Sequence, residues 1–240
     1  MQQQDDSNTK KLTRRLPAVL GIGLGANVAT MFVLGKLTEG LLHSEVKKAL
    51  DDPLKDAAQD MQNKALKPVM SLFSGLGEPW TLYPFTGFMA LRWLKQDRQV
   101  DAATLGLALV GSAALNEILK KLLKRPRPEF RIHQKKASGS SFPSSHITMS
   151  LATYGTLAYL VNRRRKRDEE QDKEWDKEHQ ARRGPAWIWA PVLAVCALIG
   201  WSRIYLGVHH PTDVLGGAVA GAIMVTTCAA ACNCLTPEQS

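Results

Sequence analysis

Long apolar stretches alternate with shorter charged ones along the whole chain. Six stretches carry few charged residues, and they cover residues 16–35, 68–94, 101–119, 143–161, 186–206 and 212–232. A helix needs about 20 apolar residues to cross the hydrocarbon core of a bilayer. So many long apolar segments cannot all be buried inside one water-soluble domain of 240 residues, and in lipid the backbone is satisfied by helices. The pattern predicts an all-α protein, a bundle of six transmembrane helices. A soluble all-helical protein is the alternative.

Two local features modify individual spans. The stretch over 68–94 is interrupted at Gly77-Glu78-Pro79, which predicts a kink and places Glu78 against protein or at the membrane interface. The stretches over 101–119 and 212–232 are rich in Gly and Ala, which suits close helix packing in lipid.

The segment after the first span has an amphipathic pattern. In residues 43–67, apolar positions recur every three or four residues among five acidic and five Lys residues. This is typical of an amphipathic helix lying at the membrane interface. The predicted units are a polar cytoplasmic N-terminus, a first span with its amphipathic helix, a membrane core with a charged cytoplasmic loop, and a tail. They cover residues 1–15, 16–67, 68–235 with the loop at 162–185, and 236–240.

A net charge of +9 is compatible with binding to nucleic acid, to anionic lipid or to a phosphorylated substrate. In residues 162–183 nine cations alternate with seven acidic residues, so this segment is predicted to be a solvated loop and nucleic-acid binding is not expected. Basic loops stay in the cytoplasm, which with six spans places both termini there. Residues 120–142 then face the opposite side with eight Lys or Arg. This placement contradicts the positive-inside rule unless these basic residues have a role in catalysis or substrate binding.

Candidate catalytic residues fall on that non-cytoplasmic side. His209 and Asp213 are four residues apart. On a helix that begins near Pro211, the carboxylate can hold one ring nitrogen of His209 and leave the other free as nucleophile or base. His210 lies three residues from Asp213 and is predicted to be a polar flank.

Other residues on the same side suit an anion. Ser144 and Ser145 follow Pro143 at an expected helix start, where backbone N–H groups lack partners within the helix and bind anions. His146 in that first turn can exchange a proton with a bound group. Guanidinium groups suit bidentate contact with phosphate oxygens. The candidate cations are Lys120, Arg127 and Arg203. Together these groups predict a pocket for a phosphoryl group.

These stretches resemble the three-part signature of the type 2 phosphatidic acid phosphatase superfamily, the lipid phosphate phosphatases. The matching residues are Lys120-x6-Arg127-Pro128, then Pro143-Ser144-Ser145-His146, then Ser202-Arg203-x5-His209-x3-Asp213. Three motifs in order and with matching internal spacing are a specific signal, whereas one alone would be weak. The motifs cover residues 120–213, and residues 1–65 carry none.

The resemblance implies a role for each matching residue. His209 would attack phosphorus and become phosphohistidine, with Asp213 orienting it. His146 would protonate the leaving oxygen and later activate water. Lys120, Arg127 and Arg203 would bind the phosphoryl oxygens.

The resemblance also implies that Ser144 and the residue at 145 contribute to phosphate binding and that neither a metal nor another cofactor is needed. The family usually has Gly where this chain has Ser145. A Ser would be strained there if the backbone needed a positive φ, and harmless if only its N–H were used. We expect the second case.

We predict a membrane lipid phosphatase that acts at the non-cytoplasmic face. Candidate substrates are phosphatidate, phosphatidylglycerophosphate and isoprenyl diphosphates, because a bilayer enzyme suits a substrate with a hydrocarbon tail. The expected partners are this lipid and the bilayer, and the oligomeric state stays open. One alternative is a vanadate-dependent haloperoxidase, which shares the oxyanion pocket in the resembling superfamily but is typically soluble. The other is a non-catalytic membrane binding or transport protein that has kept the pocket.

Overall fold

The computed structural model describes residues 2–39, 45, 47–128, 139–171 and 186–236, and every regular element in these residues is helical. The prediction of an all-α fold is therefore confirmed for this part of the chain. The elements are α1 (Gln2–Glu39), the π-helical turn η1 (Lys47–Asp51), α2 (Asp52–Asp60), α3 (Leu66–Leu76), α4 (Pro79–Leu94), α5 (Gln99–Leu123), α6 (Ser145–Gln171), α8 (Ala186–Tyr205) and α9 (Pro211–Leu235).

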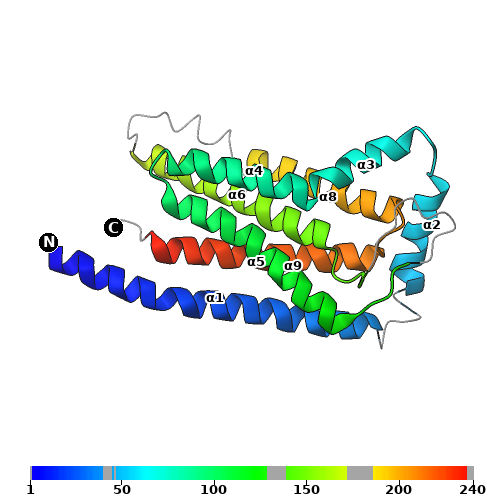
Figure 1. Cartoon of the computed structure of the whole chain (residues 1–240), viewed down its shortest axis with the longest axis horizontal. Helices are drawn as coiled ribbons and strands as arrows, with labels where there is room; N and C mark the ends of the chain where they lie inside the picture. The colour runs from blue at the N-terminus through cyan, green and yellow to red at the C-terminus, as the bar shows by residue number, and fades with distance from the viewer. Residues whose placement is uncertain (1, 40–44, 46, 129–138, 172–185, 237–240) are drawn as a thin grey trace.

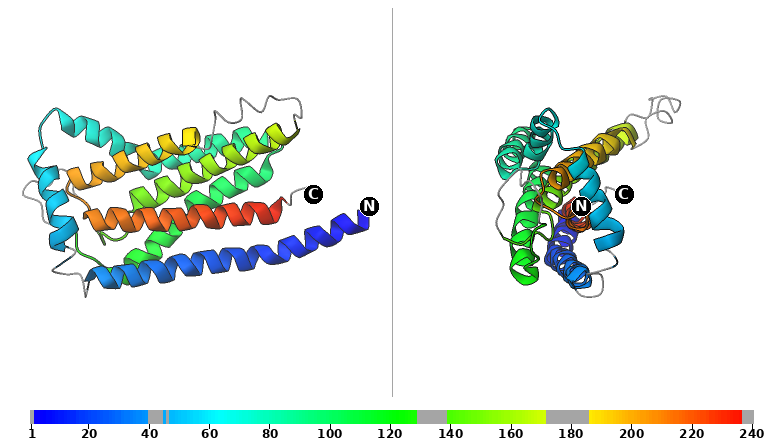
Figure 2. Two further views of the ribbon diagram at one scale, coloured as in Figure 1. Left: turned by 180° about the vertical axis from the view of Figure 1, so that it is seen from behind. Right: turned by 90° about the vertical axis from the view of Figure 1, so that its right-hand side faces the viewer.

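The long helices form an elongated bundle (Figure 1). Helix α9 packs against α1, α5 and α6, while α8 packs against α3 and α6. In Figure 1 and in the left view of Figure 2, η1 and α2 lie across one end of this bundle. The start of α1 and the end of α9 lie at the other end.

Small residues let α9 approach its neighbours closely. Asn27 of α1 donates a hydrogen bond from Nδ2 to the carbonyl oxygen of Ala220 at 2.9 Å. A Cβ atom placed on Gly221 would lie 2.9 Å from the Cβ of Leu151 on α6. The buried cluster around this contact consists of Met31, Ala108, Leu115, Leu119, Leu123, Phe142, Ala152, Ala220, Met224 and Cys228. The glycines and alanines of α9 permit this approach because they carry little or no side chain.

Within the described residues, four helical segments are long and apolar enough to cross a membrane, at Leu16–Lys36, Gln99–Leu123, Trp187–Tyr205 and Pro211–Leu235. Large apolar side chains also lie on the outside of the bundle. Examples are Ile22, Trp80 and Phe88, which are 73%, 71% and 64% exposed. Soluble proteins rarely expose large contiguous apolar surfaces. These features support an integral membrane protein.

The other two expected spans, 68–94 and 143–161, are mainly helical but are not among these four. The stretch over 68–94 breaks at the predicted position, because Pro79 begins α4 and holds Glu78 in an extended conformation after α3. Helix α6 continues past its apolar part to Gln171, so the first ten residues of the charged segment 162–185 are helical. The rest of that segment, residues 172–185, lies outside the described residues.

The amphipathic helix predicted over 43–67 is present only in part, and residues 43, 44 and 46 lie outside the described residues. Part of this segment forms η1 and α2, and a turn separates α2 from α3. Leu54 and Met61, which the periodicity assigns to the apolar face, are 41% and 48% exposed, whereas Asp51 is 2% exposed. Asp51 is buried because it binds Arg125 and Thr212 elsewhere in the chain. The position of this segment at the membrane interface stays a prediction.

Candidate active site

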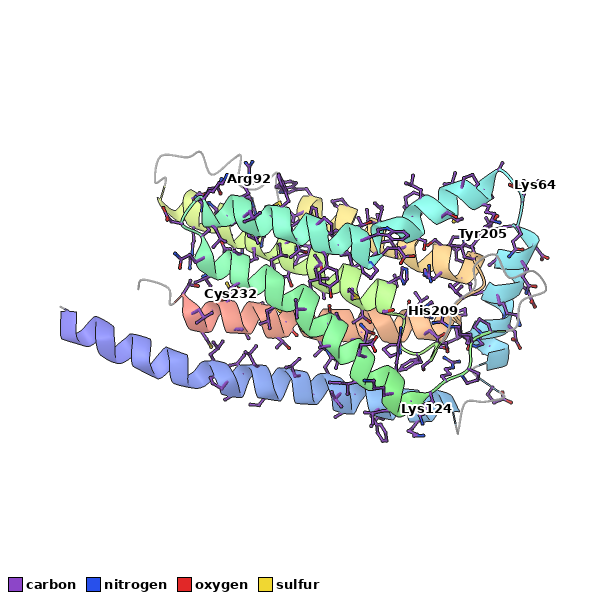
Figure 3. The ribbon with its side chains drawn as sticks, in the orientation of Figure 1. Lys64, Arg92, Lys124, Tyr205, His209 and Cys232 are labelled. Atoms are coloured by element: carbon purple, nitrogen blue, oxygen red, sulfur yellow. The ribbon has the colours of Figure 1, made fainter. Side chains whose placement is uncertain are left out.

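Direct hydrogen bonds join the three motif-bearing stretches at the end of the bundle where η1 and α2 lie. Lys120 Nζ donates to Ser145 Oγ at 3.0 Å, and Arg127 Nη1 donates to the carbonyl oxygen of Val208 at 2.7 Å. The N–H of Ser144 donates to the carbonyl oxygen of Asp213 at 3.0 Å. Figure 3 shows His209 at this end, with Tyr205 and Lys64, whereas Arg92 and Cys232 lie at the other end.

Two left-handed residues turn the chain into this arrangement. Helix α5 ends at Leu123, and Lys124 follows with φ 41°, after which the carbonyl oxygen of Arg125 accepts the N–H of Ser141 at 2.9 Å. After α8, Gly207 has φ 72°, a conformation that residues with a side chain rarely adopt. The chain therefore reverses and places His209 just before α9.

His209 and Asp213 face one another in a site closed to solvent. Their side chains are 1% and 0% exposed, and His209 Nδ1 lies 3.6 Å from Asp213 Oδ2. This distance is longer than an ordinary hydrogen bond, and catalytic hydrogen bonds often tighten only when substrate binds. Burial lowers the pKa of His209 from 6.5 to about 4, with Asp213 opposing the shift. The imidazole is therefore neutral at physiological pH, as a nucleophile requires.

His146 lies in the first turn of α6 beside a carboxylate from another helix. Its Nε2 atom is 3.2 Å from Glu78 Oε1, and the two side chains are 12% and 14% exposed. Glu78 immediately precedes α4, at the break between α3 and α4. The predicted kink thus directs Glu78 inward to the histidine.

Three cations lie close enough to act on one another, and two of them, Arg127 and Arg203, also act on His209. Arg203 is 3% exposed and donates from Nη1 to Ser74 Oγ of α3. Arg127 is half-buried and also donates from Nε to the carbonyl oxygen of Gly139 at 3.2 Å. Burial lowers the pKa of Arg127, with Asp213 opposing the shift, but a guanidinium stays cationic in proteins.

The two serines before His146 have different surroundings. The N–H of Ser144 donates a hydrogen bond to the carbonyl oxygen of Asp213. The buried Oγ of Ser144 has no hydrogen-bond partner among the described residues. Ser145 begins α6 and does not have a positive φ, so a side chain causes no backbone strain there. The N–H of Thr148 donates to the carbonyl oxygen of Ser144 at 3.0 Å, as expected for the first turn of α6, and a helix start of this kind suits an anion.

A comparison with models of protein families shows to which family the chain belongs. The model of the PAP2 superfamily matches residues 101–233, more than half of the sequence. The chain belongs to the PAP2 superfamily.

Individual relatives agree with this assignment. Phosphatidylglycerophosphatase B of Bacillus subtilis (strain 168) is 27% identical over 197 residues, which cover 81% of this chain and 89% of that protein. Undecaprenyl-diphosphatase of Sulfolobus acidocaldarius is 24% identical over 165 residues, which cover 67% of this chain and 68% of that protein.

Solved structures are similar in fold. The crystal structure of a transmembrane PAP2-type phosphatidylglycerolphosphate phosphatase from Bacillus subtilis gives a TM-score of 0.68 at 23% identity and covers 85% of this chain and 94% of that one. LpxE of Aquifex aeolicus gives a TM-score of 0.53 at 25% identity and covers 75% of this chain and 94% of that one.

The structure places residues in the PAP2 site that the sequence analysis did not assign. Glu78 contacts His146, and Ser74 contacts Arg203. Arg125 binds Asp213, and its position inside the basic motif was a signal that could have found it. Asp51 lies 3.8 Å from His210 and binds Arg125, and nothing in its local sequence points to this role.

Proposed function

We propose that the chain is a membrane lipid phosphatase that hydrolyses phosphomonoester or diphosphate groups of lipid phosphates through a phosphohistidine intermediate. The observation that carries this proposal is the set of hydrogen bonds joining Lys120 to Ser145, Arg127 to Val208 and Ser144 to Asp213. They bring a buried neutral histidine, a second histidine paired with a carboxylate, and three cations to one place. Phosphoryl transfer needs mainly such positioning and charge stabilisation.

In the first step, Nε2 of His209 attacks phosphorus and the bond from phosphorus to the leaving oxygen breaks. His146 donates a proton to that oxygen, so the lipid departs as an alcohol or as a monophosphate. The imidazole ring gains positive charge as the N–P bond forms, and Asp213 stabilises this charge through Nδ1.

In the second step, His146 takes a proton from a water molecule as the water attacks phosphorus. The N–P bond breaks, phosphate leaves and His209 returns to its neutral form. Lys120, Arg127 and Arg203 hold the phosphoryl oxygens in both steps. The hydroxyl of Ser144 supplies a further donor, and the N-terminal end of α6 favours negative charge.

The substrate is proposed to carry a hydrocarbon tail. Four apolar helices and the exposed apolar side chains support a bilayer location, where lipid phosphates are concentrated. The relatives are named as a phosphatidylglycerophosphatase and an undecaprenyl-diphosphatase. Phosphatidate, phosphatidylglycerophosphate and isoprenyl diphosphates are therefore the substrates to test.

The chain is also proposed to cross the membrane six times, with α3 and α4 together forming one crossing and α6 another. These helices run alongside the four apolar helices in the bundle (Figure 1). The basic residues 163–167 lie on the part of α6 at the end of the bundle where α1 starts and α9 ends. The positive-inside rule places that end in the cytoplasm and the site at the non-cytoplasmic face.

The test is release of inorganic phosphate by detergent-purified protein from the three candidate lipids in the presence of a chelator. Release from at least one of them, inhibited by vanadate, is expected, because vanadate imitates the transferring phosphoryl group. His209→Ala should release none. Activity that disappears with the chelator and returns with a divalent ion would contradict the mechanism. Bromide oxidation that requires added vanadate would favour the haloperoxidase alternative.

A further inference from the structure

A buried network of charges lies beside Asp213 and reaches into the segment before α2. Arg125 donates from Nη1 to Asp213 Oδ1 at 2.6 Å and from Nη2 to Asp51 Oδ2 at 3.0 Å. One guanidinium therefore bridges two carboxylates. The side chains of Arg125, Asp51 and Asp213 are 12%, 3% and 0% exposed. Exclusion from water strengthens such contacts and makes an unpaired member costly.

The two oxygens of Asp213 have different partners. Oδ1 accepts from Arg125, while Oδ2 accepts the N–H of His210 at 2.8 Å and faces His209. If the carboxylate rotated, both hydrogen bonds would be lost. Arg125 therefore keeps Oδ2 directed towards the catalytic histidine.

Asp51 holds Arg125 and the start of α9 at the same time. Its Oδ1 accepts the N–H of Thr212 at 2.9 Å, and its Oδ2 accepts the hydroxyl of Thr212 at 2.9 Å. N–H groups in the first turn of a helix have no acceptor within that helix. Asp51 supplies one from 161 residues earlier in the chain. Asp51 therefore links the start of α9, which carries Asp213, to the guanidinium of Arg125, which orients the Asp213 carboxylate.

The balance of charges gives Asp51 a second effect. His209 gains positive charge as it attacks phosphorus. Arg125 alone would neutralise Asp213, and the pair would then do little to stabilise that charge. With Asp51 present, the three groups keep one net negative charge beside His209, which favours the transition state.

We infer that Asp51 is a positioning residue for catalysis, acting through Arg125 on the carboxylate of Asp213. Arg125 belongs to the same network, in which it donates to Asp213, to Asp51 and to the hydroxyl of Thr212. The inference rests on the phosphatase function proposed above. It assigns a catalytic task to a segment outside residues 101–233, the part that matches the PAP2 family.

The adjacent Asp52 provides a matched control. Asp52 is 35% exposed and pairs with Lys55 at 3.6 Å on the surface of α2. Asp51→Asn should lower kcat by about 10- to 100-fold, the loss expected when a catalytic group is misplaced by a fraction of an ångström to one ångström. KM and the inhibition constant of inorganic phosphate should change less than about threefold, since the phosphate-binding cations are untouched. Asp52→Asn should match the wild type in all three.

A double-mutant cycle separates positioning from general destabilisation. Because Asp51 acts mainly through Asp213, adding Asp51→Asn to Asp213→Asn should lower kcat by a smaller factor than adding it to the wild type. A residue that merely stabilised the fold would lower kcat in both backgrounds alike. Asp51→Glu keeps the negative charge and should retain more activity than Asp51→Asn, and it decides the question if Asp51→Asn does not fold.

Each outcome is decisive. A wild-type protein that releases no phosphate from any lipid phosphate overturns the proposed function and this inference with it. An active wild type overturns this inference alone if Asp51→Asn matches Asp52→Asn, if the losses from Asp51→Asn and Asp213→Asn add fully, or if Asp51→Glu is no better than Asp51→Asn.

Discussion

Replacing Gly217 by Ala should separate two of the three stretches that form the site. Gly217 lies in the second turn of α9, against the loop that carries Ser144. A Cβ atom at this position would lie 2.7 Å from the carbonyl oxygen of Ser144, 3.2 Å from the Cβ of Ile147 and 3.3 Å from Oγ1 of Thr148. The nearest of these atoms belongs to the backbone and cannot move aside alone. The loop and α9 must therefore part.

The structure sets the size of this displacement. An ordinary contact begins at 3.4 Å, so the shortfall is about 0.7 Å. A movement of that size would lengthen the hydrogen bond from the N–H of Ser144 to the carbonyl oxygen of Asp213 from 3.0 Å to about 3.7 Å, beyond hydrogen-bond range. Overpacking of this kind typically costs about 1–3 kcal/mol of stability. Misplacement of catalytic groups by about this distance can cost up to about 100-fold in rate.

The matched control is Gly106→Ala on α5, where a Cβ atom would have nothing within 4 Å. Unfolding temperature in detergent and the burst of phosphoenzyme formation should be measured for both variants. Gly217→Ala should lower both quantities, and Gly106→Ala should leave the burst unchanged and the stability equal or slightly higher, since Ala favours helix. If Gly217→Ala retained wild-type stability and burst rate, the close approach of α9 to the Ser144 loop would not be what assembles the site.

Four further predictions concern catalysis and topology. His146→Ala should lose far less burst rate with p-nitrophenyl phosphate than with a lipid phosphate, because p-nitrophenolate leaves without a general acid, whose help is worth about 10²–10⁴-fold; equal losses would show that His146 only binds phosphate. Ser145→Gly should keep turnover within about tenfold, roughly 1.4 kcal/mol of barrier, because the backbone N–H remains; a larger loss would mean that the hydroxyl near Lys120 takes part. Because burial lowers the pKa of His209 to about 4, the neutral nucleophile persists above that pH, and the acid limb of the burst rate with p-nitrophenyl phosphate, which needs no general acid, should lie near pH 4 after correction for ionisation of the substrate; an acid limb near 6.5 would refute the assignment. In a cysteine-free background, Lys64→Cys should react with an impermeant thiol reagent in intact cells and Gln96→Cys should not, and reversed labelling would move the site to the cytoplasmic face.

The sequence was enough to predict the helical class and to propose the three motifs, which the structure joins by hydrogen bonds. Apolar periodicity and length are local properties, so the helices around residues 101–119 and 212–232 could be predicted without a structure. The spacing of His209 and Asp213 was equally local, since four residues make about one helical turn. The same reasoning predicted a helix over 43–67, which a turn after α2 interrupts, and a loop from residue 162, whose first ten residues continue α6. Local pattern does not show that Asp51 has a buried partner, nor that a charged helix can continue beyond an apolar span.

Only the tertiary structure decided which residues meet. Glu78 reaches His146 because the break between α3 and α4 turns it inward, and Asp51 reaches Thr212 across 161 residues of sequence. Such contacts depend on how helices cross and where loops reverse, as at Gly207, and no repeating pattern in the chain encodes them. The local sequence does not distinguish Asp52, which lies at the surface, from the adjacent Asp51, which binds a buried guanidinium. Burial and the position of the partner make the difference, and both arise only when the bundle closes.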